Sequence, residues 1–345
     1  MSTQNNPSMS TQRFPRAELR SMIDAPLTTQ AIYVAAKLGI ADLLKDGPRG
    51  TEELASAVSV NSHNLYRVLR TLASVGIFSQ TKDNLFELTP QAEYLRSDVP
   101  GSLCSWALLA GQDWFLRSLG QLLHSVKTGQ TAFDSVHNMG LFEYFGQNVE
   151  AGELFDQAMT GVTQGATEAV LDAYDFSGID TIVDVGGGHG ALIISILKKY
   201  PEMRGILFDL PSVIQRAKVS LAEEVILERC ELVGGDFFHQ VPSGGDAYIM
   251  KAVIHDWDDD RALTILRNCR QAMSENGKLL LVDNVVPSGN EPSPQKVNDL
   301  LMMVFTGGIN RTQPEYESLL GFSGFKMSKI IPTQTWLSVI EGSPD

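Results

Sequence analysis

The sequence predicts an α/β fold in its C-terminal half, and two observations support this prediction. After Gly178, short apolar runs alternate with segments of helical apolar spacing, the pattern of βαβ units in a largely parallel sheet. The first run, TIVDV, leads into the glycine-rich turn GGGHG at 186–190, and the helical segment LIISILKKY follows. The runs in chain order are TIVDVG, GILFDL, CELVGGDFF, AYIMKAVI, KLLLVDNVV, FKMSKII and TWLSVIE.

Composition and length indicate a globular protein with room for two domains. The chain has 345 residues, of which 43% are hydrophobic and 20% charged. No run of about 18 apolar residues occurs, and the start, MSTQNNPSMSTQ, lacks the features of a signal peptide. We therefore expect a cytoplasmic protein with a disordered leader over residues 1–15. Cys104, Cys230 and Cys269 lack metal-ligand spacing, so we expect no metal site.

The N-terminal part has the pattern of a winged helix. A helix is predicted from Pro26 to Leu44, two short helices follow within 51–80, and NLFELTPQAEYL reads as a small β-wing. A winged helix can bind DNA, and Arg67 and Arg70 make its second helix locally basic. However, residues 1–100 hold 10 basic and 10 acidic residues, so the net charge of −14 lies entirely after residue 100. We favour a dimerisation platform over DNA binding.

The glycine-rich turn fits more than one ligand. It matches both G-x-G-x-x-G/A, the dinucleotide fingerprint, and G-x-G-x-G, and both need glycine for close backbone approach. Asp184 precedes the turn inside a strand, where a buried carboxylate calls for a cation such as an amino acid ammonium group. Asp209, about 20 residues beyond the turn, suits ribose hydroxyls. The motif GDFF at 235–238 combines a carboxylate with two aromatic rings, which suits adenine.

At this point the chain resembles a known enzyme family. The segments VDVGGGHG, FDLP, GDFF, MKAVIHDWDDDRALTILRNC, LVDNVVP and GGINRTQPEYESLL are similar, in this order and spacing, to those of S-adenosylmethionine-dependent O-methyltransferases of the caffeic acid and hydroxyneurosporene type. The resemblance covers nearly the whole chain, and HDW at 255–257 is its most specific element. It implies S-adenosyl-L-methionine as the cofactor. The implied cofactor-binding residues are Asp184, Gly186, Gly188, Asp209, Leu210, Asp236, Phe237 and Lys251.

The resemblance also implies the catalytic group. His255 corresponds to the general base, and a base is needed because a phenol with a pKa near 10 is mostly protonated at neutral pH. The plant enzymes flank this histidine with two acidic residues, whereas this chain has Asp283 in place of the usual Glu and Asn310 where an acid is expected. We expect Asp283 to orient the imidazole, with Asp256 as a second candidate. Asn310 would help position without carrying charge.

Domain boundaries and an acceptor pocket complete the expectations from this resemblance. The predicted organisation is a leader at 1–15, a mostly helical winged-helix dimerisation domain at 16–100, a helical linker and pocket segment at 101–178, and a Rossmann-like methyltransferase domain at 179–345. Ala252 stands where plant relatives carry Trp, which implies a differently shaped pocket. The predicted pocket residues are Phe155, Met159, Ala252, Met302 and Met303.

The expected activity is methyl transfer to a phenolic or enolic hydroxyl of a small secondary metabolite by a homodimer that binds neither nucleic acid nor membrane. Two alternatives stay open. One is a family member that performs hydroxylation, decarboxylation or a pericyclic reaction in the same cofactor pocket, which the missing acid at Asn310 makes plausible. The other is a ligand-sensing winged-helix regulator, against which the intact HDW motif argues.

Overall fold

The computed structural model describes residues 15–163, 165–220 and 228–345, and the chain divides into two compact units. Unit 1 comprises residues up to 116 together with 151–162, and unit 2 comprises 117–150 and 163–345. The predicted leader, apart from Pro15, lies outside the described residues. No helix in the described ranges is long and apolar enough to cross a membrane.

Unit 1 contains the predicted winged helix. Its small sheet has the order β1-β3-β2, with antiparallel pairs on both sides of β3. A single apolar core joins its helices, and Leu54, Leu69 and Phe86 are fully buried there. Its elements, two of which extend into unit 2, are α1 (Pro15–Lys37), α2 (Ile40–Leu43), β1 (Arg49–Gly50), α3 (Thr51–Ala57), α4 (Ser62–Ser74), β2 (Phe78–Gln80), β3 (Leu85–Leu88), α5 (Pro90–Glu93), α6 (Cys104–Ala110), α7 (Asp113–Leu119) and α11 (Val149–Thr163).

The first helix differs from the prediction. It begins at Pro15 and ends at Lys37, so Pro26 lies inside α1 and not at its start. Proline lacks the N–H that would bond to the carbonyl of residue 22. Met22 and Pro26 are both exposed, so water can solvate this carbonyl and the helix continues.

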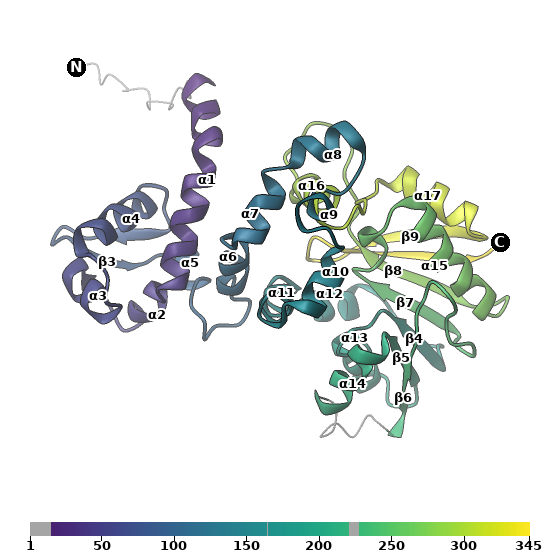
Figure 1. Cartoon of the computed structure of the whole chain (residues 1–345). Helices are drawn as coiled ribbons and strands as arrows, with labels where there is room; N and C mark the ends of the chain where they lie inside the picture. Colours follow the sequence, from purple (N-terminus) through teal and green to yellow (C-terminus); the bar gives the residue numbers. More distant parts are fainter. Residues whose placement is uncertain (1–14, 164, 221–227) are drawn as a thin grey trace, which may run out of the picture. The chain divides into compact units, whose positions relative to one another are not determined.

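Unit 2 carries the large sheet, seen in Figure 1 with its helices. The order is β6-β5-β4-β7-β8-β10-β9, in which the first five strands are parallel and the last two antiparallel. Its strands are β4 (Thr181–Val185), β5 (Arg204–Asp209), β6 (Cys230–Gly234), β7 (Ala247–Lys251), β8 (Lys278–Asp283), β9 (Phe325–Pro332) and β10 (Ser338–Pro344). Its helices are α8 (Leu122–Thr128), α9 (Ala132–His137), α10 (Leu141–Gln147), α12 (Ala166–Ala173), α13 (Ala191–Lys199), α14 (Pro211–Ser220), α15 (Asp259–Ala272), α16 (Pro294–Phe305) and α17 (Gln313–Phe322).

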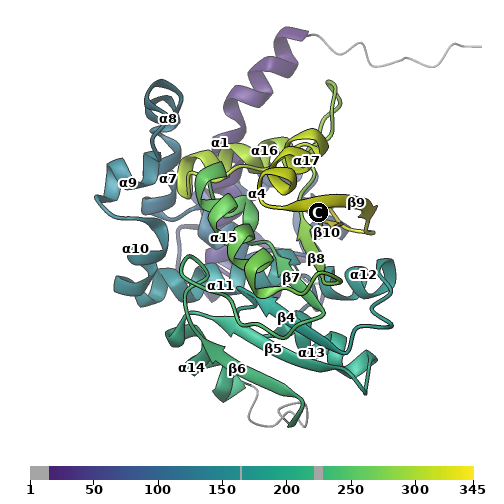
Figure 2. The ribbon, with the colours of Figure 1, turned by 90° about the vertical axis from the view of Figure 1, so that its right-hand side faces the viewer.

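The sheet is covered on both faces, as the predicted βαβ alternation requires. Successive residues of a strand point to opposite faces, so Ile182 packs with α12, α13 and α14, whereas Val183 packs with α15 and α17. Figure 2 shows these helices around the strands. Both cores consist largely of buried aliphatic and aromatic side chains. Together they fix the position of every parallel strand end, and hence of the site.

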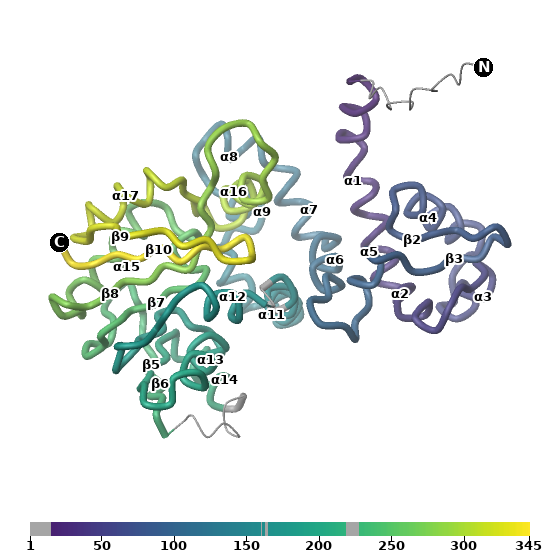
Figure 3. The backbone as a smooth tube through the Cα atoms, turned by 180° about the vertical axis from the view of Figure 1, so that it is seen from behind, coloured from purple at the N-terminus to yellow at the C-terminus, as the bar shows by residue number. Residues whose placement is uncertain are grey.

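The C-terminal hairpin completes the sheet. β10 pairs with β8 and β9 forms the outer edge, which Figure 3 shows from behind. These antiparallel strands correspond to the last two apolar runs of the sequence. The α/β class predicted from the sequence, with a helical N-terminal region and a Rossmann-like sheet, is confirmed.

Candidate active site

The carboxyl ends of the parallel strands bring the predicted site residues to one edge of the sheet. The glycine-rich turn follows β4, Asp209 ends β5, Lys251 ends β7 and Asp283 ends β8. Asp236 comes two residues after β6. Ligands of open parallel sheets bind at this edge, so the arrangement places all these polar groups where a ligand is expected.

The glycine-rich turn needs its glycines. Gly186, Gly188 and Gly190 have φ angles of 71°, 60° and 83°, a region that L-residues with a Cβ seldom adopt. A Cβ on Gly186 would lie 2.9 Å from a Val253 methyl group. The backbone therefore passes closely over the strand ends, and its surface is free of side chains at these positions.

Asp209 links this turn to the second strand. One of its carboxylate oxygens accepts a hydrogen bond from the Gly188 N–H at 2.8 Å, and the other accepts one from the Leu210 N–H at 2.7 Å. Burial raises the pKa of Asp209, and these two N–H donors lower it in turn. Each carboxylate oxygen keeps a further lone pair, so Asp209 can also accept hydroxyl groups such as those of ribose.

Asp184 is a buried carboxyl group without hydrogen bonds. It is 1% exposed, and neither carboxyl oxygen has a hydrogen-bond partner among the described residues. Burial raises its pKa to about 7, although the positive charge of Lys251 acts in the opposite direction. Burial also lowers the pKa of Lys251, while Asp184 and Glu168 raise it. A buried carboxyl group without hydrogen bonds is costly. Asp184 and Lys251 therefore fit a ligand that carries both an ammonium and a carboxylate group, as S-adenosylmethionine does.

The third strand end carries an acid beside aromatic rings. Asp236 accepts hydrogen bonds from the Phe238 N–H at 2.8 Å and from His239 Nδ1 at 3.0 Å. The Phe237 ring lies 5.0 Å from that of Phe238 and 6.0 Å from that of Trp257, both edge to face. This cluster offers apolar surface and an acceptor, as adenine recognition requires.

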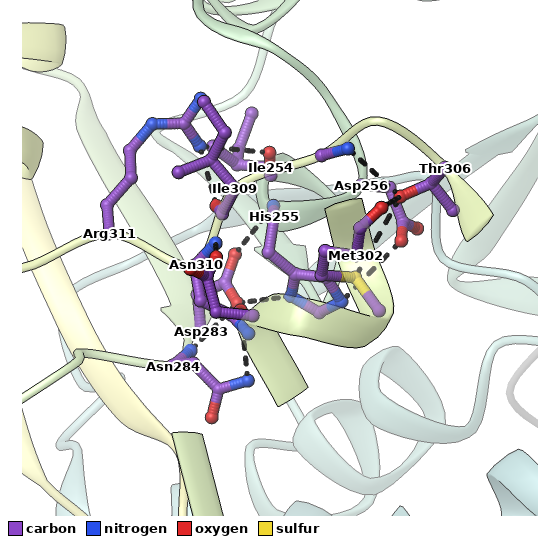
Figure 4. A network of polar contacts seen from close by, with 12 residues as sticks. Ile254, His255, Asp256, Asp283, Asn284, Met302, Thr306, Ile309, Asn310 and Arg311 are labelled. Carbon is purple, nitrogen blue, oxygen red and sulfur yellow. Dashed lines mark hydrogen bonds and ion pairs between the residues drawn. The ribbon is translucent and has the colours of Figure 1, made fainter. Parts of the chain in front are cut away.

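His255 and Asp283 form a buried pair, although 28 residues separate them in the chain (Figure 4). His255 lies in a 3-10 turn, Ile254–Asp256, directly after β7. Its ring Nδ1 donates to Asp283 Oδ1 at 2.5 Å, and its backbone N–H donates to Asp283 Oδ2 at 3.2 Å. Asp283 therefore fixes both the backbone and the ring of His255, which leaves Nε2 as the nitrogen that can accept a proton.

The charges around His255 strengthen it as a base. Burial lowers its pKa, but the carboxylates of Asp283 and Asp256 raise it, and the result is about 9. Such a base is well matched to a phenol, because the two pKa values lie close together. At pH 7 most His255 rings carry a proton, so the reactive neutral form is the minor one.

Asp256 lies closer to the imidazole than the sequence suggests. Neighbouring side chains on a strand point to opposite faces, whereas the 3-10 turn brings Asp256 Oδ1 to 3.7 Å from His255 Nε2. Burial raises the pKa of Asp256 to about 6, while His255 lowers it. Asp256 thus adds negative charge near Nε2, the ring nitrogen that Asp283 does not contact.

Asn310 is linked to Asp283 through Asn284. Its Oδ1 accepts from Asn284 Nδ2 at 3.2 Å, and its backbone N–H donates to Asp299 at 2.8 Å. The backbone N–H of Asn284 in turn donates to Asp283 Oδ1 at 2.8 Å. The sequence did not single out Asn284; its position directly after a predicted acid at a strand end was the signal.

The predicted pocket residues fall into two groups. Ala252, Met302 and Met303 belong to unit 2, the unit that contains His255, and Met302 is drawn with His255 in Figure 4. Phe155 and Met159 lie on α11 in unit 1. Their place in an acceptor pocket stays a prediction, and so do the predicted domain boundaries. Among the described residues no cluster of His, Cys, Asp or Glu has the arrangement of a metal site.

Comparisons with known proteins agree with the site chemistry. A family model described as an O-methyltransferase domain matches residues 119–326, and one described as an O-methyltransferase dimerisation domain matches 21–98. The chain is 46% identical to the phenazine O-methyltransferase PhzM of Lysobacter antibioticus, over 94% of this chain and 95% of that protein. It is 35% identical to an 8-amino-8-demethylriboflavin N,N-dimethyltransferase of Streptomyces davaonensis, over 90% of each chain.

A solved structure of a relative includes the cofactor product. The O-methyltransferase NcsB1 from neocarzinostatin biosynthesis, in complex with S-adenosylhomocysteine and 1,4-dihydroxy-2-naphthoic acid, superposes with a TM-score of 0.81. The two chains are 30% identical, over 95% of this chain and 98% of that one. The family resemblance predicted from the motifs is confirmed, and so is S-adenosylmethionine as the cofactor. The chain belongs to the family of S-adenosylmethionine-dependent O-methyltransferases that carry an N-terminal dimerisation domain.

Proposed function

We propose that this methyltransferase methylates a hydroxyl group of an aromatic small molecule, with His255 as the general base. The buried hydrogen bond between His255 and Asp283 is the observation that carries the proposal. An acceptor with a proton to lose needs a base, and this pair lies at the same strand edge as the residues predicted to bind the cofactor. S-adenosylmethionine, when bound, supplies the electrophilic methyl group.

The positions of the chain's own residues support a role for each of them in this proposal. Asp184 and Lys251 pair with the charged groups of the amino acid part, Asp209 accepts ribose hydroxyls, and Asp236 and Phe237 bind adenine. His255 takes the acceptor proton at Nε2, while Asp283 keeps the ring oriented and stabilises its charged form. The Asn310 side chain accepts a hydrogen bond from the Asn284 side chain. It thereby helps to hold the segments next to His255 in place without adding charge.

The acceptor class can be narrowed further. The 46% identical relative is named for a phenazine and the solved relative contains a dihydroxynaphthoic acid, so we propose a fused-ring aromatic acceptor with a phenolic hydroxyl. A hydroxyphenazine is the first compound to test. Such planar acceptors fit a site with large apolar side chains, of the kind predicted for Met302 and Met303.

N-methylation is the second candidate. One relative is named as an N,N-dimethyltransferase, and a ring nitrogen needs no base. The raised pKa of His255 leaves most rings protonated, and so unable to accept a proton, at pH 7 and below, and this favours N-methylation in that range. The short hydrogen bond to Asp283 favours O-methylation, because an acceptor without a proton would have no use for an oriented base.

The experiment is a product analysis with S-adenosylmethionine and matched acceptors. A monohydroxyphenazine, its methoxy counterpart and the unsubstituted phenazine should be incubated separately, with S-adenosylhomocysteine release and product mass recorded together. We expect a neutral methyl ether from the hydroxy compound alone. A fixed-charge N-methyl product from the compounds without a hydroxyl would overturn the proposal in favour of N-methylation.

A further inference from the structure

The segment 308–311 lies directly against the turn that carries His255. The Ile309 N–H donates to the His255 carbonyl at 2.9 Å. A Cβ on Gly308 would lie 2.0 Å from this same carbonyl oxygen, so only glycine permits the approach. The backbone of His255 is thus fixed from this side as well as by Asp283.

Arg311 extends this contact to both ends of the turn. Its Nη1 donates to the carbonyls of Ile254 and Ile309, each at 3.2 Å, and its Nη2 donates to the Trp257 carbonyl at 3.0 Å. Ile254 and Trp257 bracket His255 and Asp256 in the chain. Figure 4 shows the guanidinium beside the segment that bears the imidazole.

One acidic residue balances the guanidinium. Asp259 Oδ1 accepts from Arg311 Nε at 3.0 Å and from Nη2 at 2.8 Å. The Arg311 side chain is 1% exposed, whereas that of Asp259 is 67% exposed. Burial of the guanidinium costs desolvation, and the exposed Asp259 carboxylate is screened by water, so the ion pair adds little to fold stability and does not by itself account for the burial of Arg311.

The charge of Arg311 acts on the base. Asp283 from β8 and Asp256 from the turn raise the pKa of His255, and Arg311 from the segment before α17 lowers it, as burial does. Tyr316 from α17 adds no charge, because burial and Asp283 raise the pKa of its hydroxyl. Arg311 is therefore the positive side chain that opposes the two carboxylates at this ring.

We propose that Arg311, paired with Asp259, is a positioning residue for His255: its hydrogen bonds fix the turn that carries the ring, and its positive charge favours the neutral imidazole that accepts the acceptor proton. This inference rests on the proposed role of His255 as the base. Its two parts, geometry and charge, separate experimentally.

Arg311→Met and Asp259→Asn form a matched pair, because they break the same ion pair but remove opposite charges. The pH profile of kcat/KM reports the pKa of the base in the free enzyme. With Arg311→Met we expect the acid limb to move to higher pH, so that the loss at pH 7 exceeds the loss at high pH by about three- to tenfold. With Asp259→Asn, the uncompensated arginine should leave the limb in place or move it to lower pH.

Two further variants separate geometry from charge. Arg311→Lys keeps the charge without the planar fork, so it should lower kcat at all pH values without moving the limb. Arg267→Met, which removes an exposed arginine that donates to the Phe322 carbonyl, should behave as wild type. An NMR titration of His255, assigned with His255→Gln, measures the same pKa without any acceptor. It therefore tests Arg311 even if hydroxyl methylation is not found.

The proposal predicts different changes of the His255 pKa when Arg311 and when Asp259 is replaced. A rise of the His255 pKa in Arg311→Met together with no rise in Asp259→Asn supports it. Equal losses of kcat/KM at every pH in both variants, with an unchanged His255 titration, would show that Arg311 is only structural.

Discussion

Asp283 contacts His255 at two points, the ring Nδ1 and the backbone N–H, from the end of the neighbouring parallel strand. A carboxylate that binds both groups fixes the side-chain rotation as well as the backbone position. The imidazole is thus pre-oriented by two strand ends whose separation the sheet itself sets. Pre-orientation of this kind is what a proton acceptor needs when its partner must also line up with a methyl donor.

The pH dependence of the wild-type enzyme should follow from His255. Because its folded-state pKa is raised to about 9, the reactive neutral ring becomes more abundant as the pH rises from 7 to 9. We expect kcat/KM to increase over this range and then level off, when measured with one phenolic acceptor in buffers of constant ionic strength. A flat profile from pH 6 to 9 would be inconsistent with a base of this pKa.

Asp184 should lower the stability of the ligand-free protein and raise its affinity for the cofactor. Its folded-state pKa of about 7 lies above the usual 3.8, so the ionised group destabilises the ligand-free protein increasingly from pH 4 to 7 and by a constant amount above. Asp184→Asn should raise the melting temperature at pH 8, with the difference vanishing toward pH 4.

The same substitution should weaken binding of S-adenosylhomocysteine by about 10- to 100-fold, since it removes a charged hydrogen-bond partner. Calorimetry measures this affinity, and Asp180→Asn, at a residue exposed outside the site, serves as the control. Unchanged affinity in Asp184→Asn would remove the carboxylate from the cofactor site.

Ala252, which follows Lys251 and precedes the turn that carries His255, has a strained backbone conformation. Its φ is 56°, a left-handed conformation that costs an alanine about 1–2 kcal/mol relative to the usual regions. Ala252→Gly should therefore raise the free energy of unfolding by about 0.5–1 kcal/mol, after the greater freedom of glycine in the unfolded chain is subtracted. Ala262→Gly, inside α15, should lower it. Denaturant unfolding of both variants is the measurement, and destabilisation by Ala252→Gly would contradict the assignment.

A homodimer should form through α1. Leu19, Met22, Ile23 and Leu27 recur at helical spacing and are 59–73% exposed within the single chain. An exposed apolar stripe of this kind indicates a contact with another protein chain. Light scattering should report twice the chain mass of 37.7 kDa, and Met22→Glu with Ile23→Glu should halve it. Ser56→Glu, on the exposed side of α3, should leave it unchanged, and a monomeric wild type would refute the prediction.

The sequence predicted the strands of the sheet, but it did not predict the order of the last strands at its edge. Alternation of apolar runs with helical segments is a local signal, so the α/β class and the strands could be read directly. The insertion of β10 between β8 and β9 depends on pairing between distant segments, which no local pattern encodes. The start of α1 was missed because Pro26 resembles a first-turn proline, although water can solvate the carbonyl it leaves unpaired.

The motifs identified residues that the structure brings close together, but they did not identify Arg311, which contacts the His255 turn through backbone carbonyls. The family motifs brought forward His255 and Asp283, which the structure places within hydrogen-bond distance. Arg311 was overlooked, because an arginine next to a polar residue reads as a surface charge, and only the fold reveals that it is buried. Asp259 lies among three successive acidic residues, of which Asp258 is the N-cap of α15, so its place in the sequence does not indicate that it binds Arg311.

Whether His255 removes the acceptor proton is decided by measuring methyl transfer and S-adenosylhomocysteine affinity together in His255→Ala. The histidine addresses the acceptor and not the cofactor, so binding by calorimetry should match the wild type. The rate should fall by about 10²- to 10⁴-fold at pH 7, the usual contribution of a positioned base, and recover partly as the acceptor ionises at higher pH. A wild-type rate for this variant at pH 7, with the same methyl ether as product, would contradict the claim.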